Sequence, residues 1–396
     1  MKNNKQISIA GFTHYTSNVM TMLYRKMKKA DRKLSILGFG CMRLPQTLDC
    51  HIDEPQATEM VRYAIDRGVN YIDTAYVYHN GESEPFLGRA LADGYREKVS
   101  LATKLPVFNV ETREDMDRLL DEQLRRLNTD HIDFYLLHGL TGRTWDTAQE
   151  LHVTEFLDQI IADGRVRHVG FSFHDEVNLF KGIVDAYDWT FCQIQYNYMD
   201  GEYQAGTTGL NYAVEKGLGI VIMEPLRGGL LARENGEIKK TWASTGLSRT
   251  PAEWGLRWLW NKPEISVVLS GMSTMAQVRD NVKYANDGKP GSLTSDELAV
   301  YDTVKTVYRE RMKVPCTQCR YCIPCPGGIK IPECFAAFND AAMYHDTAAA
   351  KFSYDVFIGS CGDASACQEC GVCESLCPQK IEIRKRLKDV VQLFGH

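Results

Sequence analysis

The chain has 396 residues, of which 44% are hydrophobic and 24% are charged, and its formal net charge is -5. This apolar content suffices for one large domain and a smaller one, and it excludes an intrinsically disordered chain. The negative balance offers no basic field to nucleic acid or to acidic membranes, and no apolar run reaches the roughly 18 residues of a membrane span. We therefore expect neither nucleic acid nor a membrane as a partner.

Residues 1–21 show neither helical periodicity nor helix caps, and Met22 opens a stretch that reads like a second start. We expect 1–21 to be a disordered extension or the product of an upstream start codon. The N-terminus also lacks the charged-then-apolar pattern of a secretory signal, so we expect a cytoplasmic protein.

Eight β-type runs alternate with helix-period segments from about Leu34 to Tyr284. Eight strands separated by helices within about 250 residues predict a (β/α)8 TIM barrel, which we assign to residues 22–312. A doubly wound sheet is the alternative, but the sequence has no G-x-G-x-x-G turn and no P-loop. The predicted strands are 35–40, 69–73, 99–104, 131–138, 166–173, 191–196, 219–224 and 265–269.

Helix-capping signals mark two of the predicted helices. Between the fourth and fifth strands, Thr147 and Glu150 form a predicted capping box, and Gly164 is predicted to end that helix. After the barrel, Thr294 and Glu297 form a second predicted capping box, for a helix that runs to about residue 312.

Polar side chains lie at or just beyond the ends of successive predicted strands. Because reactive groups of such barrels lie at the carboxyl ends of the strands, we expect these side chains to converge on one mouth. In chain order they are Asp73, Tyr78, Lys104, His138, Ser172 and Gln193.

Four of these side chains predict acid catalysis on a carbonyl group. A phenol has an ordinary pKa of about 10, and a nearby ammonium group lowers it, so we expect Lys104 to lower the pKa of Tyr78. We expect Asp73 to keep Lys104 protonated and oriented. His138 is expected to hydrogen-bond the substrate oxygen and fix the carbonyl for hydride attack from a cofactor.

From about Met22 to Tyr284 the sequence resembles the aldo-keto reductase family, through "YIDTAYVYHNGESEPFLGRAL", "SLATK", "IDFYLLH", "VGFSF" and "QIQYN". The resemblance implies a small carbonyl or alcohol substrate and NAD(P)H bound without a Rossmann turn. It also implies a catalytic tetrad, which falls on Asp73, Tyr78, Lys104 and His138.

The same resemblance implies a set of cofactor contacts, with some departures. His174 stands two residues after Ser172 where the family usually has a Ser-Asn pair, and Met223 stands where many members stack an aromatic ring. Gly271 and Gln277 occupy positions that often hold Lys or Arg, so we expect no strong preference for NADPH over NADH. The implied contacts are Ser172, Gln193, Met223, Leu226, Gly271, Gln277 and Asn281.

Ten of the 13 cysteines lie between residues 316 and 377. A reducing cytoplasm disfavours disulfides, so this spacing predicts metal or cluster ligands. One run has the C-x2-C-x2-C-x3-C-P spacing of bacterial ferredoxins, and the other has a shorter last interval. By resemblance to two-cluster ferredoxins, one [4Fe-4S] cluster is expected on Cys316, Cys319, Cys322 and Cys377, and the other on Cys367, Cys370, Cys373 and Cys325.

We therefore expect residues 313–396 to form a small, mainly helical, ferredoxin-like iron-sulfur domain that closes with an amphipathic helix. Two structural zinc sites are the alternative, since sets of four cysteines also bind zinc. Cys334 and Cys361 are expected as spare buried thiols, although Cys361 could compete for the second cluster. The remaining cysteines, expected in the core or at the surface, are Cys41, Cys50 and Cys192.

The combination predicts an NAD(P)H-dependent oxidoreductase whose clusters exchange electrons with the barrel site or with an external electron-transfer partner. A hydride carries an electron pair whereas a cluster exchanges single electrons, so direct coupling calls for a flavin or a radical intermediate, and no motif indicates a flavin. Two alternatives stay open: an electron-transfer module and a redox sensor. In each of them the barrel binds the nicotinamide cofactor without carbonyl turnover.

Overall fold

The computed structural model describes residues 21–30, 32–233, 236–316, 318, 320–359 and 362–395. Residues 1–20 of the predicted N-terminal extension lie outside the described residues, as do the expected cluster ligand Cys319 and the spare thiol Cys361.

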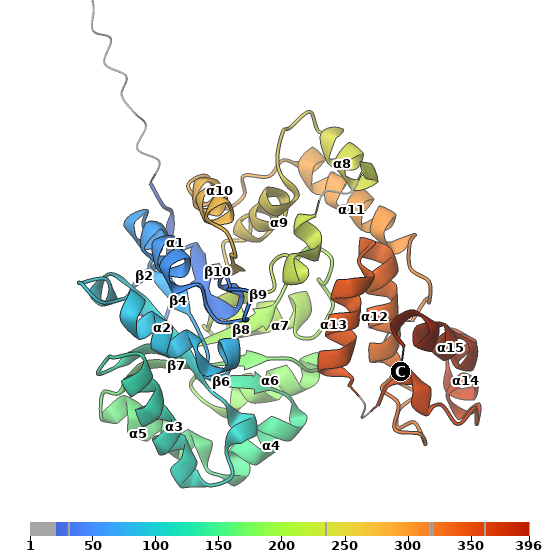
Figure 1. Ribbon diagram of the computed structural model, residues 1–396, viewed down its shortest axis with the longest axis horizontal. Helices are drawn as coiled ribbons and strands as arrows, with labels where there is room; N and C mark the ends of the chain where they lie inside the picture. Colours follow the sequence, from blue (N-terminus) through green and yellow to red (C-terminus); the bar gives the residue numbers. More distant parts are fainter. Residues whose placement is uncertain are drawn as a thin grey trace, which may run out of the picture.

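Eight parallel strands close into a barrel in the order β10-β3-β4-β5-β6-β7-β8-β9 (Figure 1). Each predicted run overlaps one of these strands, so the sequence-based prediction of a (β/α)8 barrel is confirmed, although β5, β6 and β10 extend one or two residues beyond the predicted ends. The strands are β3 (Leu37–Gly40), β4 (Tyr71–Asp73), β5 (Ser100–Leu105), β6 (Ile132–Leu140), β7 (Val166–Phe173), β8 (Phe191–Gln195), β9 (Gly219–Met223) and β10 (Ile265–Gly271).

A short antiparallel hairpin, β1 (Tyr24–Lys26) and β2 (Lys33–Ser35), precedes the barrel and was not predicted. Its connecting segment carries Met27, which is fully buried in the apolar cluster that fills the barrel interior. Met27 occupies the space beside Gly219 at the start of β9, where an added Cβ would lie 2.2 Å from its Cγ. The hairpin therefore contributes side chains to the interior at the amino-terminal end of the strands.

Helices surround the barrel, and their predicted ends are partly confirmed. Gly164 ends a helix with φ of 83°, as predicted, but the capping box at Thr147 is wrong. Thr147 lies inside a helix that Thr141 caps, and the left-handed His152 separates this helix from the next. The barrel helices are α1 (Glu54–Asp66), α2 (Ser83–Ala90), α3 (Arg113–Arg126), α4 (Gly142–Glu150), α5 (Val153–Ala162), α6 (Val177–Ala186), α7 (Gly206–Glu215), α8 (Gly236–Ala243), α9 (Pro251–Trp260) and α10 (Met275–Ala285).

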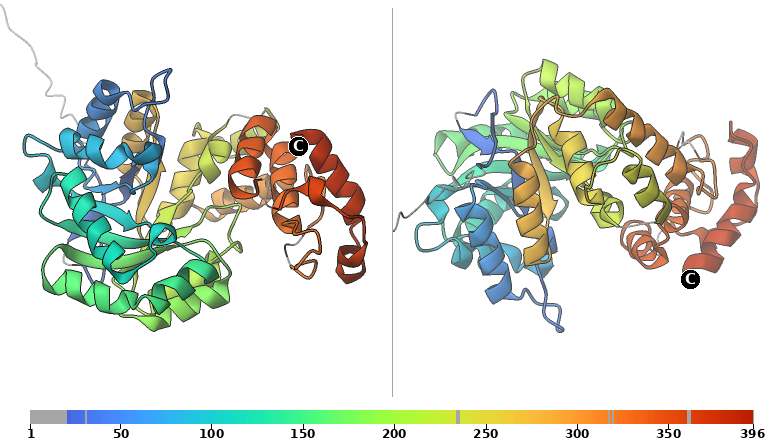
Figure 2. Two further views of the ribbon diagram at one scale, coloured as in Figure 1. Left: turned by 60° about the horizontal axis from the view of Figure 1, so that its bottom comes forward. Right: turned by 90° about the horizontal axis from the view of Figure 1, so that it is seen from above.

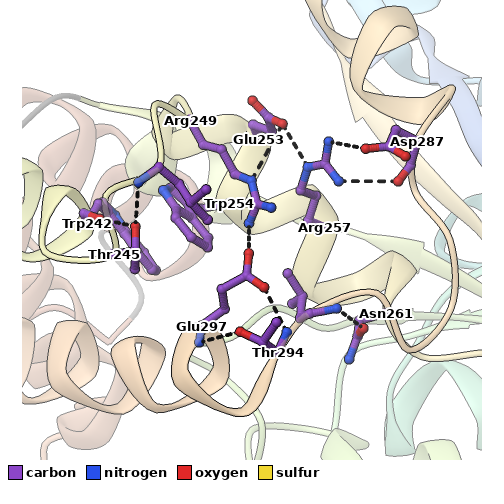
Figure 3. A network of polar contacts seen from close by, with 12 residues as sticks. Trp242, Thr245, Arg249, Glu253, Trp254, Arg257, Asn261, Asp287, Thr294 and Glu297 are labelled. Atoms are coloured by element: carbon purple, nitrogen blue, oxygen red, sulfur yellow. Dashed lines mark hydrogen bonds and ion pairs between the residues drawn. The ribbon is translucent and has the colours of Figure 1, made fainter.

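Helix α11 (Ser295–Arg309) follows the barrel, and a polar network joins its first turn to α9 (Figure 3). Thr294 and Glu297 form the predicted capping box of α11. Glu297 also pairs with Arg249, whose guanidinium lies 4.5 Å from the ring centroid of Trp254 on α9. The start of α11 is thus held on the side of the barrel.

The rest of the described chain forms a helical lobe on one side of the barrel, drawn in orange and red (Figures 1 and 2). Its apolar core includes Phe335, Tyr354 and Leu387, one from each of its three longer helices. Within the described residues after β10 there is no strand, which agrees with a mainly helical segment. The lobe contains α12 (Ile331–Tyr344), α13 (Thr347–Phe357), α14 (Val372–Leu376) and α15 (Ile383–Phe394).

Charged contacts fasten the lobe to loops that leave the carboxyl ends of the barrel strands. Arg227, in the loop after β9, forms ion pairs with Asp340 of α12 at 3.1 Å and with Asp200 of the loop after β8 at 3.2 Å. Arg320 of the cysteine-rich segment lies 3.3 Å from Glu176 after β7. The lobe therefore borders the mouth of the barrel. None of the described helices is long and apolar enough to span a bilayer.

Candidate active site and cysteine-lined cavity

The parallel strands bring the predicted tetrad together at one end of the barrel. Asp73 is the last residue of β4, and Lys104 lies one residue before the end of β5. His138 lies near the end of β6, and Tyr78 begins the short helical turn that follows β4. Residues far apart in the chain meet here because the carboxyl ends of neighbouring parallel strands share one edge.

Lys104 is the centre of this group, and its ammonium is completely buried. It donates hydrogen bonds to both carboxylate oxygens of Asp73, at 2.8 and 2.9 Å, and to the carbonyl oxygen of Thr74 at 2.6 Å. It also donates to the Tyr78 hydroxyl at 3.3 Å. Asp73 therefore orients an ammonium that points at the phenol.

Burial and charge act in opposite directions on the Lys104–Asp73 pair. Burial acts to lower the pKa of Lys104, but the Asp73 charge and the Tyr78 hydroxyl outweigh it, so this pKa is raised. Burial raises the pKa of Asp73, and the Lys104 charge opposes that rise. Lys104 thus stays protonated at neutral pH.

Lys104 acts to lower the pKa of Tyr78, as expected, but the net shift of this pKa is upward. Burial raises the pKa of the phenol, and the opposing charge of Lys104 only partly offsets that effect. The sequence shows the cation but not the degree of burial, so it predicts the lowering effect alone. Tyr78 consequently keeps its proton at neutral pH, as a proton donor must.

His138 completes the group as a neutral imidazole. Burial, together with the charge of Lys104, holds its pKa well below the ordinary value. The ring centroids of Tyr78 and His138 are 6.0 Å apart, with the rings nearly perpendicular, and Phe108 packs against the other part of the imidazole at 5.6 Å. Its Nδ1 is buried and has no hydrogen-bond partner among the described residues.

The predicted nicotinamide contacts line the neighbouring strand ends. Ser172 on β7 accepts a hydrogen bond from the backbone N–H of Gly139 at 2.8 Å. On β8, Gln193 donates its amide to the sulfur of Met223 at 3.6 Å, while its Oε1 is buried without a described partner. An unpaired amide oxygen at this depth fits a ligand that donates a hydrogen bond, as a nicotinamide carboxamide does.

The remaining predicted cofactor contacts lie beside β9 and β10. Leu226 packs against Gly255 of α9, and Gly271 is the last residue of β10. Gln277 caps α10 by accepting the backbone N–H of Ser273 at 2.8 Å. Asn281 donates to the hydroxyl of Ser270 at 3.0 Å. The side chains of Gln277 and Asn281 therefore organise the start of α10.

Three residues that no motif marks also belong to this region. Phe108 contacts His138, and Arg227 joins the loop after β9 to the lobe. Arg43 follows β3, and its aliphatic stem covers Gly271. The one sequence feature that points to Arg43 is its position just after a predicted strand.

Three of the four cysteines expected for one cluster line a single cavity in the lobe. Cys316, Cys322 and Cys377 contribute to the wall of this cavity. The rest of the wall is largely apolar, with Ile331 and Phe335 among the contributors. The structure thus brings together thiols from both cysteine runs, 55 residues apart between Cys322 and Cys377.

The four cysteines expected for the other cluster also include close neighbours from both runs. Burial raises the pKa of Cys373, and the charges of Glu374, Cys325 and Cys367 raise it further, which places these thiols near one another. Cys370 is exposed. Of the cysteines expected to be spare or unrelated to clusters, Cys41, Cys192 and Cys334 are buried and Cys50 is exposed.

The two cysteine runs share a backbone pattern. In the first run Gln318 and Arg320 have left-handed φ angles of 57° and 63°, and in the second Glu369 and Gly371 have 54° and 75°. Each pair stands two and four residues after the first cysteine of its run. Left-handed non-glycine residues cost energy and concentrate where a ligand site imposes them.

Within the described residues, which exclude Cys319 and Cys361, no three His, Cys, Asp or Glu side chains lie in an arrangement that could hold one metal ion.

Comparisons with known proteins agree with the barrel. The sequence matches the Aldo/keto reductase family over residues 36–290, more than half of the chain. The uncharacterized oxidoreductase YrpG of Bacillus subtilis (strain 168) is 29% identical over 307 residues, which cover 66% of this chain and 90% of YrpG. The aldo-keto reductase YhdN of the same organism is 28% identical over 222 residues, covering 53% of this chain and 64% of YhdN.

Solved structures show the same likeness. The holo form of aldo-keto reductase AKR11C1 from Bacillus halodurans has a TM-score of 0.61 and 27% identity, covering 72% of this chain and 96% of that one. An aldo-keto reductase from Klebsiella pneumoniae, solved in complex with NADPH, shares the fold with a TM-score of 0.59 at 24% identity and the same coverage. The family match ends at residue 290, before the cysteine-rich segment.

Proposed function

Because the chain belongs to the aldo/keto reductase family and is an oxidoreductase, we propose that it interconverts a small carbonyl compound and the corresponding alcohol with NAD(P)H. One observation carries this proposal: a protonated Tyr78 receives a hydrogen bond from a buried Lys104 that Asp73 orients. The unpaired Oε1 of Gln193 gives the cofactor a further anchoring point beside this group.

In the reductive direction Tyr78 donates its proton to the oxygen of the carbonyl. Lys104 stabilises the phenolate that remains, and Asp73 holds Lys104 in place. The neutral His138 positions the carbonyl oxygen by hydrogen bonding without adding a competing acid. A bound reduced nicotinamide supplies the hydride.

Replacing the proton donor tests this function. In Tyr78→Phe we expect the reduction of a panel of aromatic and aliphatic aldehydes to fall by about 10²- to 10⁴-fold, with cofactor binding retained. Tyr76→Phe is the matched control, because that half-buried hydroxyl lies in the same loop but donates to Glu122 at 3.1 Å. Undiminished turnover in Tyr78→Phe would contradict the assignment.

We further propose that the lobe holds two [4Fe-4S] clusters with crossed ligation. One set is Cys316, Cys319, Cys322 and Cys377, and the other is Cys367, Cys370, Cys373 and Cys325. The shared cavity of three thiols supports the first set, and the proximity of Cys325 to Cys367 and Cys373 supports the second. The matched left-handed backbone of the two runs supports equivalent roles for them.

The arrangement of the thiols favours a group of several atoms over zinc. A zinc ion needs four ligands at about 2.3 Å from one point. Within the described residues no three such ligands meet at one point, and Cys316, Cys322 and Cys377 instead line a cavity with a largely apolar wall. Iron and acid-labile sulfide analysis of anaerobically purified protein distinguishes the two, since a zinc protein contains neither.

The position of the lobe supports a redox connection to the barrel. Asp340 of α12 pairs with Arg227, four residues after Met223 in the loop that leaves β9. Bound clusters would supply the transfer of single electrons, and we propose an external electron-transfer protein as their partner. This coupling distinguishes the proposed function from that of a barrel acting alone.

A further inference from the structure

The proposed cofactor site lacks cations at two positions where members of this family often carry them. Gly271 has no side chain, and Gln277 closes the first turn of α10 by accepting the N–H groups of Ser273 and Thr274 at 2.8 and 3.3 Å. A dinucleotide carries negatively charged phosphates, and protein sites for such groups use arginine, lysine or backbone N–H donors. A positive charge is therefore to be sought elsewhere around β10.

Arg43, which follows β3, brings a guanidinium to the end of β10. It ends the short helical turn after β3, and the Ser273 hydroxyl donates to its backbone carbonyl at 2.8 Å. A Cβ added at Gly271 would lie 3.3 Å from each of the Cβ, Cγ and Cδ atoms of Arg43. The arginine stem consequently runs directly over the glycine where the family often places a cation.

The guanidinium end of Arg43 reaches the loop after β9. Its Nη2 would lie 3.2 Å from a Cβ added at Gly228. Gly228 and Gly229 have φ angles of 63° and 97°, so this part of the loop uses backbone conformations that glycine adopts without strain. The absence of side chains at Gly228 and Gly271 leaves room for Arg43 to span the two loops.

Arg43 is exposed, and within the part of the chain that the structure describes no ion pair joins it to an acidic side chain, although its charge acts to lower the pKa of the Glu224 carboxyl, which burial raises. Arg227, which also lies at the barrel mouth, differs in this respect because it pairs with two aspartates. An arginine presents planar N–H donors that match two oxygens of one phosphate, and it is charged at every physiological pH. The chemistry of Arg43 thus suits an anionic ligand.

We propose that Arg43 binds a phosphate group of the nicotinamide dinucleotide and supplies the positive charge that Gly271 and Gln277 do not. This inference rests on the proposed function, because it takes dinucleotide binding at the barrel mouth as its premise. The phosphate belongs either to the pyrophosphate, which NADH and NADPH share, or to the 2′-phosphate, which NADPH alone carries.

Equilibrium binding to the full-length protein tests the proposal without relying on turnover. We would measure dissociation constants of NADH and NADPH by quenching of tryptophan fluorescence in wild type, Arg43→Ala and Arg43→Lys. A charge-assisted hydrogen bond accounts for about tenfold or more in affinity, so Arg43→Ala is expected to bind at least about tenfold more weakly. Arg43→Lys, which retains the charge, is expected to lose less.

The two cofactors distinguish the two phosphates. Weaker binding of both NADH and NADPH in Arg43→Ala assigns the arginine to the pyrophosphate, and weaker binding of NADPH alone assigns it to the 2′-phosphate. The matched control is Arg279→Ala, because the guanidinium of this exposed α10 residue lies over the ring of Tyr63, 5.7 Å from its centroid. Arg279→Ala is expected to keep wild-type affinities.

Equal affinities of wild type and Arg43→Ala for both cofactors would overturn the inference. This failure differs from a failure of the proposed function, in which wild-type protein itself binds neither NADH nor NADPH. Because Arg43 is exposed, we expect the thermal unfolding midpoint of Arg43→Ala to match that of wild type. A matched midpoint makes any change in affinity a binding effect.

Discussion

The barrel and the lobe organise their chemically active side chains in different ways. In the barrel, Asp73, Lys104 and Tyr78 contact one another directly at 2.8 to 3.3 Å. In the lobe, Cys316, Cys322 and Cys377 line the wall of a cavity. The barrel site is therefore completed by protein groups, whereas the arrangement of the lobe is suited to a bound group.

This difference has a consequence for stability. The barrel core is continuous and includes residues from all eight of its strands and the helices around them. The lobe has a smaller apolar core, against which Cys316, Cys322, Cys325, Cys367 and Cys377 pack as partly buried side chains. If clusters occupy the thiols, the lobe depends on them for stability and the barrel does not.

Removal of iron is expected to change the stability of the lobe more than any of the substitutions below. Anaerobic chelation is expected to destabilise the lobe by several kcal/mol and to leave the barrel folded, because metal binding and folding are coupled in small metal domains. Limited proteolysis checks this: the region after about residue 313 should become sensitive while 22–312 resists. Equal resistance before and after chelation would contradict the dependence.

Single cysteine variants sharpen the same contrast. Cys325→Ser is expected to lower the iron content by up to about half, because one of the two proposed sets of four ligands is broken. Cys334→Ser is the control: this buried thiol contacts Tyr354 and Gly362 and belongs to neither set. Equal iron contents in the two variants would refute the ligand assignment.

In the barrel, Lys104→Met is expected to lower the free energy of unfolding by about 3–5 kcal/mol. Lys104→Met leaves the Asp73 carboxylate buried without its partner, which is costly because a buried charge loses solvation. Chemical denaturation followed by tryptophan fluorescence measures the loss. Lobe iron content should stay at the wild-type level, since the change lies in the barrel.

Lys98→Met is the matched control for that experiment. Lys98 pairs with Asp66 at 3.5 Å, and both side chains are about half exposed. Exposed pairs contribute about 0–1 kcal/mol, so this variant should remain near wild type. If Lys98→Met and Lys104→Met lose similar amounts of unfolding free energy, burial does not make the Lys104–Asp73 pair more important for stability than an exposed pair.

A smaller effect, on the pH dependence of stability, is expected at the Arg227–Asp340 contact between the barrel and the lobe. Burial raises the pKa of Asp340 to about 6, although the charge of Arg227 opposes the rise. In the unfolded chain an aspartate has a pKa of about 4, so the folded protein holds this proton more tightly. The stability contributed by Asp340 is thus greatest below pH 4 and falls as the pH rises through 6.

Asp340→Asn tests that sign because the amide does not titrate. Between about pH 4 and 6 the free energy of unfolding of wild type should decrease relative to that of Asp340→Asn. Asp389→Asn, at a more exposed pair with Arg386 on α15, should run parallel to wild type. If the free energy of unfolding of wild type instead rises with pH relative to that of Asp340→Asn, the pKa of Asp340 is lowered and not raised in the folded protein.

The sequence predicted the barrel well because its strands are short apolar runs separated by periodic helices. The same alternation placed Asp73, Lys104 and His138 at strand ends, where the structure also has them. The β1–β2 hairpin was missed, since strands of only three residues are too short to show a periodic signal. The break between α4 and α5 was missed because it depends on a left-handed His152.

Contacts between segments far apart in the sequence were harder to predict than the helices and strands themselves. The resemblance to two-cluster ferredoxins predicted that Cys377 would join Cys316 and Cys322, and the fold places these three cysteines in the wall of one cavity. The position of Arg43 over Gly271 and the pairing of Arg227 with Asp340 depend on how loops meet. Burial likewise decides the pKa of Tyr78, and burial is a property of the folded chain.

The proposed function makes the barrel and the lobe parts of one redox protein. Anaerobic titration of freshly purified protein with NADH and then NADPH, with iron and sulfide quantified and visible absorbance recorded, tests it most directly. We predict that the protein contains iron and sulfide and that the reduced nicotinamide bleaches the visible absorbance. Absorbance that dithionite bleaches but neither nicotinamide changes would contradict the claim and leave the barrel working independently of the lobe.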